Sequence, residues 1–194
     1  MFLCKNNYCY QYIPKNASSF ITNHLRDLHW SEINLNQIDT NYTVIAVLRD
    51  PYTRWISGFV EDVTGMNDKD LSNKIISVLE DENTWFLDWI FTSKTFNIGW
   101  HTKLQKDWIY PSLIPQTVFF KIENNLNLKL HHWLVGEGLP NKFQNLPAFN
   151  SRQDSVVYQK INSYLLDAKN KDKKDMLLEY LQSEYDFINS ITFY

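Results

Sequence analysis

The feature that most constrains the fold is a nearly continuous apolar run from Thr43 to Leu48. Such a run is typical of a parallel strand whose two faces are both covered. Arg49 follows the run directly, and then come Asp50 and Pro51. Because proline is favoured in the first turn of a helix, these residues predict that a helix begins here. The pattern predicts an α/β fold with Arg49 at the carboxyl end of a strand, where ligands bind in open α/β sheets.

A second segment of the same kind lies nearer the start of the chain. Residues 8–13 form an aromatic and β-branched run that predicts a buried strand, and Lys15 follows shortly after it. We expect a helix from Ser19 to Leu28, which Ser18 or Ser19 can cap. A lysine beside the free N–H groups of a helix N-terminus is suited to an anion. Together the two segments suggest a ligand with two separated phosphate-like groups.

The chemistry of the first loop differs from that of the common phosphate-binding loops. The chain has no glycine before Gly58, which excludes both the Walker A loop and the glycine-rich dinucleotide loop in this region. Taken alone, the segment around Lys15 is equally compatible with an ordinary strand, turn and helix that carry an exposed lysine. By the same reasoning, we expect the charged side chain of Arg54 to lie in solvent on the surface of a helix. The second segment shifts the balance towards anion binding.

Residues 14–20, Pro-Lys-Asn-Ala-Ser-Ser-Phe, resemble the 5′-phosphosulfate loop of the sulfotransferases that use 3′-phosphoadenosine 5′-phosphosulfate (PAPS). Residues 49–57 resemble their 3′-phosphate motif, in which an arginine and a serine lie eight positions apart, as Arg49 and Ser57 do. The likeness is closest to the carbohydrate-modifying branch and its small bacterial and viral relatives. Weaker matches are Trp100-His101 with Gln105, residues 120–124, Asn150-Ser151-Arg152 and residues 185–187.

The resemblance implies transfer of the sulfuryl group from PAPS, as co-substrate, to a hydroxyl of a carbohydrate, without a metal ion. Lys15 would stabilise the charge that develops on the leaving phosphate. Arg49 and Ser57 would hold the 3′-phosphate. Arg152 could reach the same phosphate, and an ordinary surface arginine is the alternative for this residue. The residues implied around the 5′-phosphosulfate are Lys15, Asn16, Ala17, Ser18, Ser19 and Phe20. Phe20 is equally compatible with a place in the core.

An acceptor hydroxyl needs a general base, and several side chains compete for this role. His101 is the first choice because of its place in the resemblance and in a loop-like segment. His29, after the first helix, is the second choice, and Glu61 or Asp62 is the third. For each histidine, a structural or surface role remains an alternative.

The remaining pattern alternates strands with helices, which predicts a P-loop-like three-layer sandwich with a mainly parallel central sheet, in one domain over residues 1–194. The predicted helices are residues 71–91, 126–135, 156–167 and 174–183; the predicted strand is residues 118–122. We expect a loop over residues 139–154 and a solvated turn over the charged run 169–175.

Composition narrows the possible partners and the compartment. The net charge of −3 argues against general nucleic-acid binding. No apolar run approaches the roughly 18–20 residues of a membrane span, and no leader pattern is seen, so we expect a cytoplasmic protein.

Cys4 and Cys9 lack partners for a zinc site, which favours reduced, buried thiols. The oligomeric state is not predicted.

Two alternatives from other classes remain open. The first is a module that binds PAP (3′-phosphoadenosine 5′-phosphate) or a glycan without transferring sulfate. The second is a P-loop-like small-molecule kinase, although the glycine loop and a magnesium-binding carboxylate signature are not seen. The aromatic-rich stretch from Trp85 to Trp108 could line a sugar cleft or belong to the core.

Overall fold

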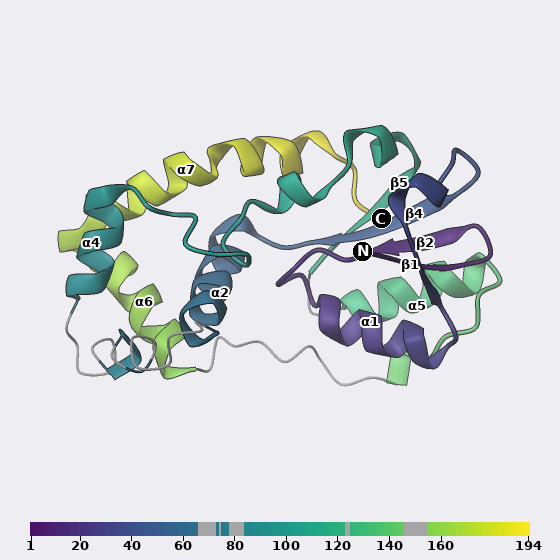
Figure 1. Ribbon diagram of the computed structural model, residues 1–194, viewed down its shortest axis with the longest axis horizontal. Coiled ribbons are helices and arrows are strands. Elements are labelled where there is room, and N and C mark those ends of the chain that lie inside the picture. The colour runs from purple at the N-terminus through teal and green to yellow at the C-terminus, as the bar shows by residue number, and fades with distance from the viewer. Residues whose placement is uncertain (66–72, 74, 78–83, 123–124, 146–154) are drawn as a thin grey trace. The chain divides into compact units, whose positions relative to one another are not determined.

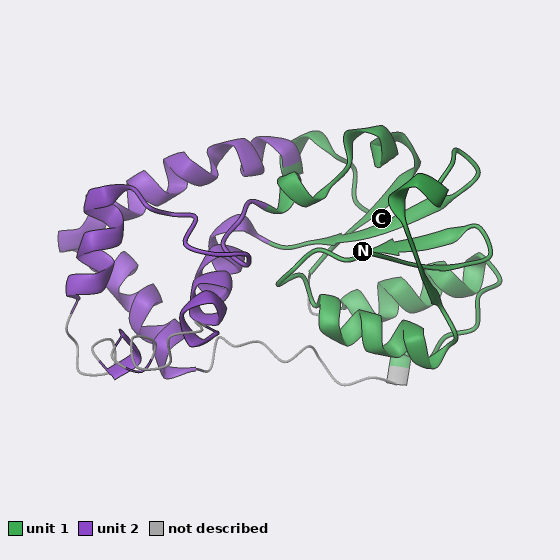
Figure 2. Ribbon diagram, viewed as in Figure 1, with its two compact units in different colours: residues 1–49, 105–150, 188–194 green, residues 50–104, 151–187 purple. Residues whose placement is uncertain are grey.

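The structure is a computed structural model that describes residues 1–65, 73, 75–77, 84–122, 125–145 and 155–194 (Figure 1). The chain divides into two compact units, each with its own core (Figure 2). Unit 1 comprises residues 1–49, 105–150 and 188–194, and unit 2 comprises residues 50–104 and 151–187.

Unit 1 is built on a five-stranded sheet in the order β3-β1-β2-β4-β5. The strands are β1 Phe2–Lys5, β2 Tyr8–Gln11, β3 Ser31–Ile33, β4 Thr43–Leu48 and β5 Thr117–Lys121. The β1 strand pairs antiparallel with β2 and β3, whereas β4 pairs parallel with β2 and β5. The α/β class is therefore confirmed, but the sheet is mixed and only partly parallel.

The antiparallel half of the sheet comes from a hairpin that the sequence pattern does not reveal. A short turn joins β1 to β2, and its Asn6 has a φ of 54°. Asparagine tolerates this left-handed conformation better than most residues. The register of the hairpin sets Cys4 directly opposite Cys9, with 4.1 Å between their Cα atoms. The two cysteines form a disulfide, so the prediction of reduced thiols is wrong for this structure.

The apolar run of β4 is explained by cores on the two faces of the sheet. Helices α1 Ser18–Asp27 and α5 Leu126–Gly136 cover one face, where Ile45 and Val47 contact them (Figure 1). On the other face Val44 packs with Leu113 of the 3₁₀ segment η3, Pro111–Gln116. In the described part of unit 1, α-helices thus lie against one face of the sheet.

Unit 2 is helical in the part that the structure describes. Its helices are α2 Pro51–Thr64, α4 Trp85–Ser93, α6 Val156–Leu166 and most of α7 Lys171–Ser190. Trp55 lies at the centre of the aromatic core and donates its Nε1–H to the carbonyl of Phe96 at 2.8 Å. None of the described helices is long and apolar enough to cross a membrane.

The predictions for β2, β4, β5, α1, α5 and α6 are confirmed to within one or two residues at each end, and α2 begins where predicted. The predicted helix 174–183 is confirmed within α7, which is longer than predicted. The end of the predicted helix 71–91 is confirmed by α4, but the helix is not continuous as predicted, because Thr84 is the non-helical N-cap of α4. Residues 66–72, 74 and 78–83 lie outside the described residues. The turn predicted over residues 169–175 is wrong because this run is helical, although most of its side chains are exposed as predicted. The run lies in η6 Ala168–Asn170 and the start of α7, where Lys173 pairs with Asp88 and lies over the ring of Tyr164.

Candidate functional site

The loop between β2 and α1 has an unusual backbone for its residue types. Lys15 and Ala17 have φ angles of 66° and 57°. Both lie in the left-handed region that side chains with a Cβ seldom adopt. Ala17 is also the N-cap of α1, so a left-handed residue leads directly into a right-handed helix. Alternation of left- and right-handed residues is found in backbone turns whose N–H groups bind anions.

The start of α1 has no side-chain cap. The prediction that Ser18 or Ser19 caps this helix is therefore wrong: Ser18 is buried and Ser19 is exposed, while the left-handed Ala17 occupies the N-cap. Without a capping oxygen, the first turn of α1 retains the anion-binding character of a helix N-terminus. Phe20 is half-buried and packs against the core of unit 1.

Arg49 lies at the same sheet edge as the Lys15 loop. The β2 and β4 strands are neighbours and run parallel, so the segments that follow them leave from the same, carboxyl edge. Lys15 belongs to the segment after β2, and Arg49 follows β4 directly. This is the edge at which ligands bind in α/β sheets, and both cations predicted for unit 1 are placed there.

Two buried side-chain amides connect these segments. The pairing of β2 with β4 ends at Tyr10 opposite Ile45, although β4 continues beyond this pair. Asn16 Nδ2 donates to the carbonyl of Val47 and to Gln105 Oε1, both at 2.8 Å. Gln105 holds the backbone of Arg49 from both sides: Oε1 accepts from Arg49 N–H at 3.1 Å, and Nε2 donates to the Arg49 carbonyl at 2.7 Å. The two amides thus continue the hydrogen bonding of β4 where β2 has ended.

Replacing Gln105 with alanine should destabilise unit 1. Gln105 is fully buried, and its loss leaves the N–H and carbonyl of Arg49 without these hydrogen bonds. We expect the free energy of unfolding to fall by about 1–3 kcal/mol, the cost of an unsatisfied buried polar group. Urea unfolding measures this change.

The matched control is Gln116→Ala, which removes one exposed hydrogen bond, to the carbonyl of Asp39. A surface substitution of this kind should change stability by less than about 0.5 kcal/mol. Equal effects of the two substitutions would contradict the prediction for Gln105.

The second predicted motif continues into unit 2 along α2. Asp50 caps this helix by accepting from Thr53 N–H at 2.9 Å, and its other oxygen accepts from Tyr185 Oη at 3.2 Å. Burial, together with the charge of Asp50, raises the pKa of Tyr185 to about 12.

Ser57 is buried on α2. The interpretation of Arg54 as a solvated charge is wrong, because its guanidinium is buried and donates to the Lys103 carbonyl at 2.6 Å.

His101 forms a dyad with Asp62 inside unit 2. The His101 Nδ1 atom lies 2.8 Å from Asp62 Oδ1, and the His101 side chain is 31% exposed while that of Asp62 is 7% exposed. A carboxylate beside Nδ1 favours the tautomer that carries its proton there, which leaves Nε2 with a lone pair. His101, the first choice for the general base, is thus hydrogen-bonded to Asp62, one of the two residues in the third choice.

Two glycines allow this dyad to form. A Cβ atom at Gly58 of α2 would lie 2.2 Å from the carbonyl oxygen of His101, and a Cβ at Gly99 would lie 2.5 Å from Asp62 Cγ. Both distances are far below van der Waals contact, so only glycine fits either position. These two glycines were the sequence signal for a close approach of α2 to the loop, and the sequence reasoning did not use it.

The structure separates His29 from the Lys15 loop. His29 is exposed and follows the C-terminal end of α1, whereas Lys15 precedes the N-terminal end of the same helix. The helix between these ends has 10 residues. At the rise of an α-helix this corresponds to about 15 Å. Arg152 lies outside the described residues.

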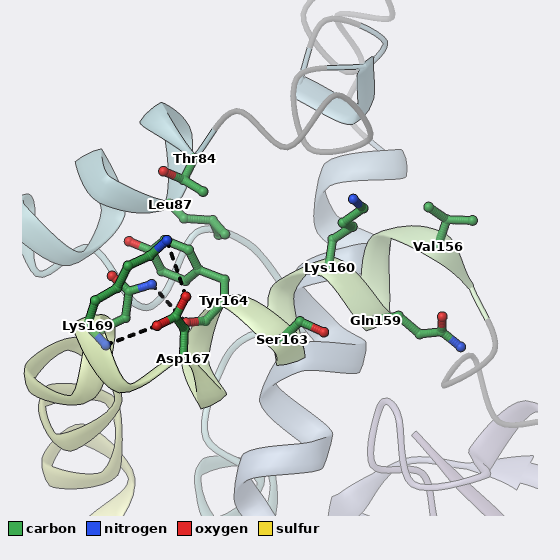
Figure 3. A pocket seen from close by; sticks show the side chains of 10 residues that line it. Thr84, Leu87, Val156, Gln159, Lys160, Ser163, Tyr164, Asp167 and Lys169 are labelled. Carbon is green, nitrogen blue, oxygen red and sulfur yellow. Dashed lines mark hydrogen bonds and ion pairs between the residues drawn. The ribbon is translucent and has the colours of Figure 1, made fainter.

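Unit 2 also contains a cavity of about 370 Å³, bounded by α6, the start of α4 and η6 (Figure 3). Its wall is mixed in character, with the apolar Leu87 and Val156 beside the polar Ser163 and Asp167. Asp167 accepts from the N–H and the amine of Lys169, at 3.0 and 3.2 Å (Figure 3). None of the residues that line the cavity belongs to the predicted site.

Comparisons with known proteins identify no family for this chain. No protein-family model, curated protein or solved structure matches the chain. Within the described residues, no group of three or more histidine, cysteine, aspartate or glutamate side chains is arranged to hold a metal ion.

Proposed function

We propose that the chain is a sulfotransferase that moves the sulfuryl group from PAPS to a hydroxyl of a carbohydrate, on a P-loop-like three-layer scaffold. One observation carries the proposal: the left-handed turn at Lys15 and Ala17 is hydrogen-bonded, through Asn16 and Gln105, to the backbone of Arg49. The backbone segments that carry Lys15 and Arg49 are therefore connected at one sheet edge, which supports a site that uses both cations. Such an arrangement suits a nucleotide with phosphate groups at both its 5′ and 3′ positions.

In the proposed reaction, the acceptor oxygen forms a bond to sulfur while the bond from sulfur to the bridging oxygen breaks, and PAP leaves. Lys15 and the N–H groups at the start of α1 stabilise the charge that develops on the departing phosphate. Arg49 and Ser57 bind the 3′-phosphate, as the motif resemblance implies. His101 takes the proton of the acceptor hydroxyl, and Asp62 stabilises the resulting imidazolium.

The proposal is tested by titrating the protein with PAP, 5′-AMP and ATP with Mg²⁺ in a calorimeter. PAP should bind far more tightly than 5′-AMP, because Arg49 and Ser57 contact only a 3′-phosphate. Arg49→Ala should weaken PAP binding by roughly 1.5–3 kcal/mol, the value of a hydrogen bond to a charged group. Ser57→Ala should cost less, because it removes a neutral donor.

The matched control is Arg26→Ala, which removes an exposed arginine of unit 1 that pairs with Glu32. This variant should bind PAP as the wild type does. Equal affinity for PAP and 5′-AMP would overturn the proposal, and preference for ATP with Mg²⁺ would favour a kinase instead. Tight PAP binding without transfer to any carbohydrate would make the chain a binding module.

A further inference from the structure

The loop that carries His101 is held rigidly by α2. Asp62 accepts from the N–H of His101 at 3.0 Å and from the N–H of Thr102 at 2.9 Å. The fully buried Thr102 hydroxyl accepts from the N–H of Ile98 and of Gly99, both at 3.0 Å. The buried Arg54 fixes the carbonyl of Lys103. The backbone on both sides of residue 100 is therefore fixed by hydrogen bonds.

This rigid loop presents a large aromatic side chain to solvent. Trp100 precedes His101 in the chain and is 56% exposed. Such exposure is notable because burial of an indole is strongly favourable. The amine of the exposed Lys103 lies 5.4 Å from the centre of the Trp100 ring. This distance is within cation–π range. An aromatic face and a positive charge are thus held together beside the histidine of the dyad.

We infer that Trp100 and Lys103 form the acceptor subsite and that the acceptor is an anionic saccharide, one that carries a carboxylate or a sulfate. The inference rests on the proposed function and specifies its acceptor. The negative face of the indole attracts the partially positive C–H groups on one face of a sugar ring. The Lys103 amine attracts the acidic group. Because the loop is fixed, little conformational entropy is lost when a sugar ring stacks on it.

The exposure of Trp100 favours a saccharide over a small phenolic acceptor. Sites for small apolar molecules are concave and bury most of the ligand between hydrophobic walls. Trp100 instead has more than half of its surface in solvent. An extended, hydroxyl-rich chain can stack one ring on an exposed indole and leave its other hydroxyls hydrated.

The experiment is a calorimetric titration with three probes: a tetrasaccharide of alternating glucuronic acid and N-acetylglucosamine, neutral cellotetraose, and 4-nitrophenol. Trp100→Ala should weaken binding of the acidic tetrasaccharide about tenfold or more, and Trp100→Phe should weaken it less. The matched control is Trp89→Ala, which removes a tryptophan of unit 2 that is 51% exposed on α4 and should leave binding unchanged.

Lys103→Gln should weaken binding of the acidic tetrasaccharide but not of cellotetraose, and the difference should shrink as salt is added. Its control is Lys174→Gln, because the Lys174 amine also lies over an aromatic ring, that of Tyr52. Equal effects of Trp100→Ala and Trp89→Ala, or no binding of the acidic tetrasaccharide to the wild type, would overturn the inference. Binding of 4-nitrophenol alone, dependent on Trp100, would overturn it in favour of a phenolic acceptor.

Titration of the same variants with PAP distinguishes failure of this inference from failure of the proposed function. Trp100 is exposed, so Trp100→Ala should fold and should bind PAP as the wild type does. If the wild type binds the acidic tetrasaccharide through Trp100 but does not bind PAP, the subsite is supported and the transferase is rejected. If PAP binds and the saccharide result is negative, the transferase is retained with another acceptor.

Discussion

Lys15→Ala is expected to lower the rate of sulfuryl transfer by about 10²-fold or more, the effect of removing one preorganised donor to a developing charge. The affinity for PAP should change much less. The amine interacts most strongly when the bond to sulfur breaks and the bridging oxygen gains negative charge. An interaction that strengthens in the transition state affects turnover more than ground-state binding. Turnover at saturating substrate and calorimetry with PAP give the two quantities separately.

The left-handed backbone at Lys15 requires a second variant. Residue 15 has a φ of 66°, at which a residue with a Cβ is strained, so Lys15→Ala keeps the strain that the lysine already carries. Lys15→Gly removes the amine and accepts this conformation. Both variants should lose a similar amount of turnover if the amine is responsible. Lys142→Ala, which removes an exposed lysine of unit 1, serves as the control and should remain active. Equal losses in PAP affinity and in turnover would instead make Lys15 an anchor for the bound nucleotide.

The elements that could be predicted from the sequence are those with a strong local signal. The β4 strand is an uninterrupted apolar run, and α2 follows an Asp-Pro start whose aspartate does accept from Thr53 N–H. The β1 strand and the Cys4–Cys9 disulfide depend on strand pairing and register, which short strands without a strong turn signal do not encode locally. For the same reason the antiparallel half of the sheet was not foreseen.

In the candidate site too, local features could be predicted from the sequence, whereas contacts between distant residues could not. Lys15 and Arg49 lie in recognisable loops, and each follows a strand that the pattern locates. The role of Asn16 depends on Gln105, which lies 89 residues further along the chain, and no local pattern connects the two amides. The dyad joins residues 39 positions apart. Gly58 and Gly99 offered a usable signal there, because an isolated glycine within a helix or a loop often marks a close approach of backbone or side chain.

The final prediction concerns His101 as the general base. His101→Ala should nearly abolish transfer, with a loss of about 10²–10⁴-fold, because general-base catalysis contributes about this much. Binding of PAP should remain, since none of the proposed PAP contacts involves this imidazole. His29→Ala is the matched control, and it should keep its activity because His29 follows the opposite end of α1 from the Lys15 loop.

Asp62→Asn tests whether the carboxylate sets the tautomer of His101. The amide can turn an N–H towards Nδ1, which then must accept, so the proton of the ring moves to Nε2 and the base is lost. Turnover should fall in this variant although the protein remains folded, and circular dichroism checks the fold.

Free imidazole should partly restore transfer in His101→Ala, because a small base can occupy the vacated space and take the acceptor proton. Rescue would not be expected if His101 were only structural, and full activity of His101→Ala would remove it from the mechanism.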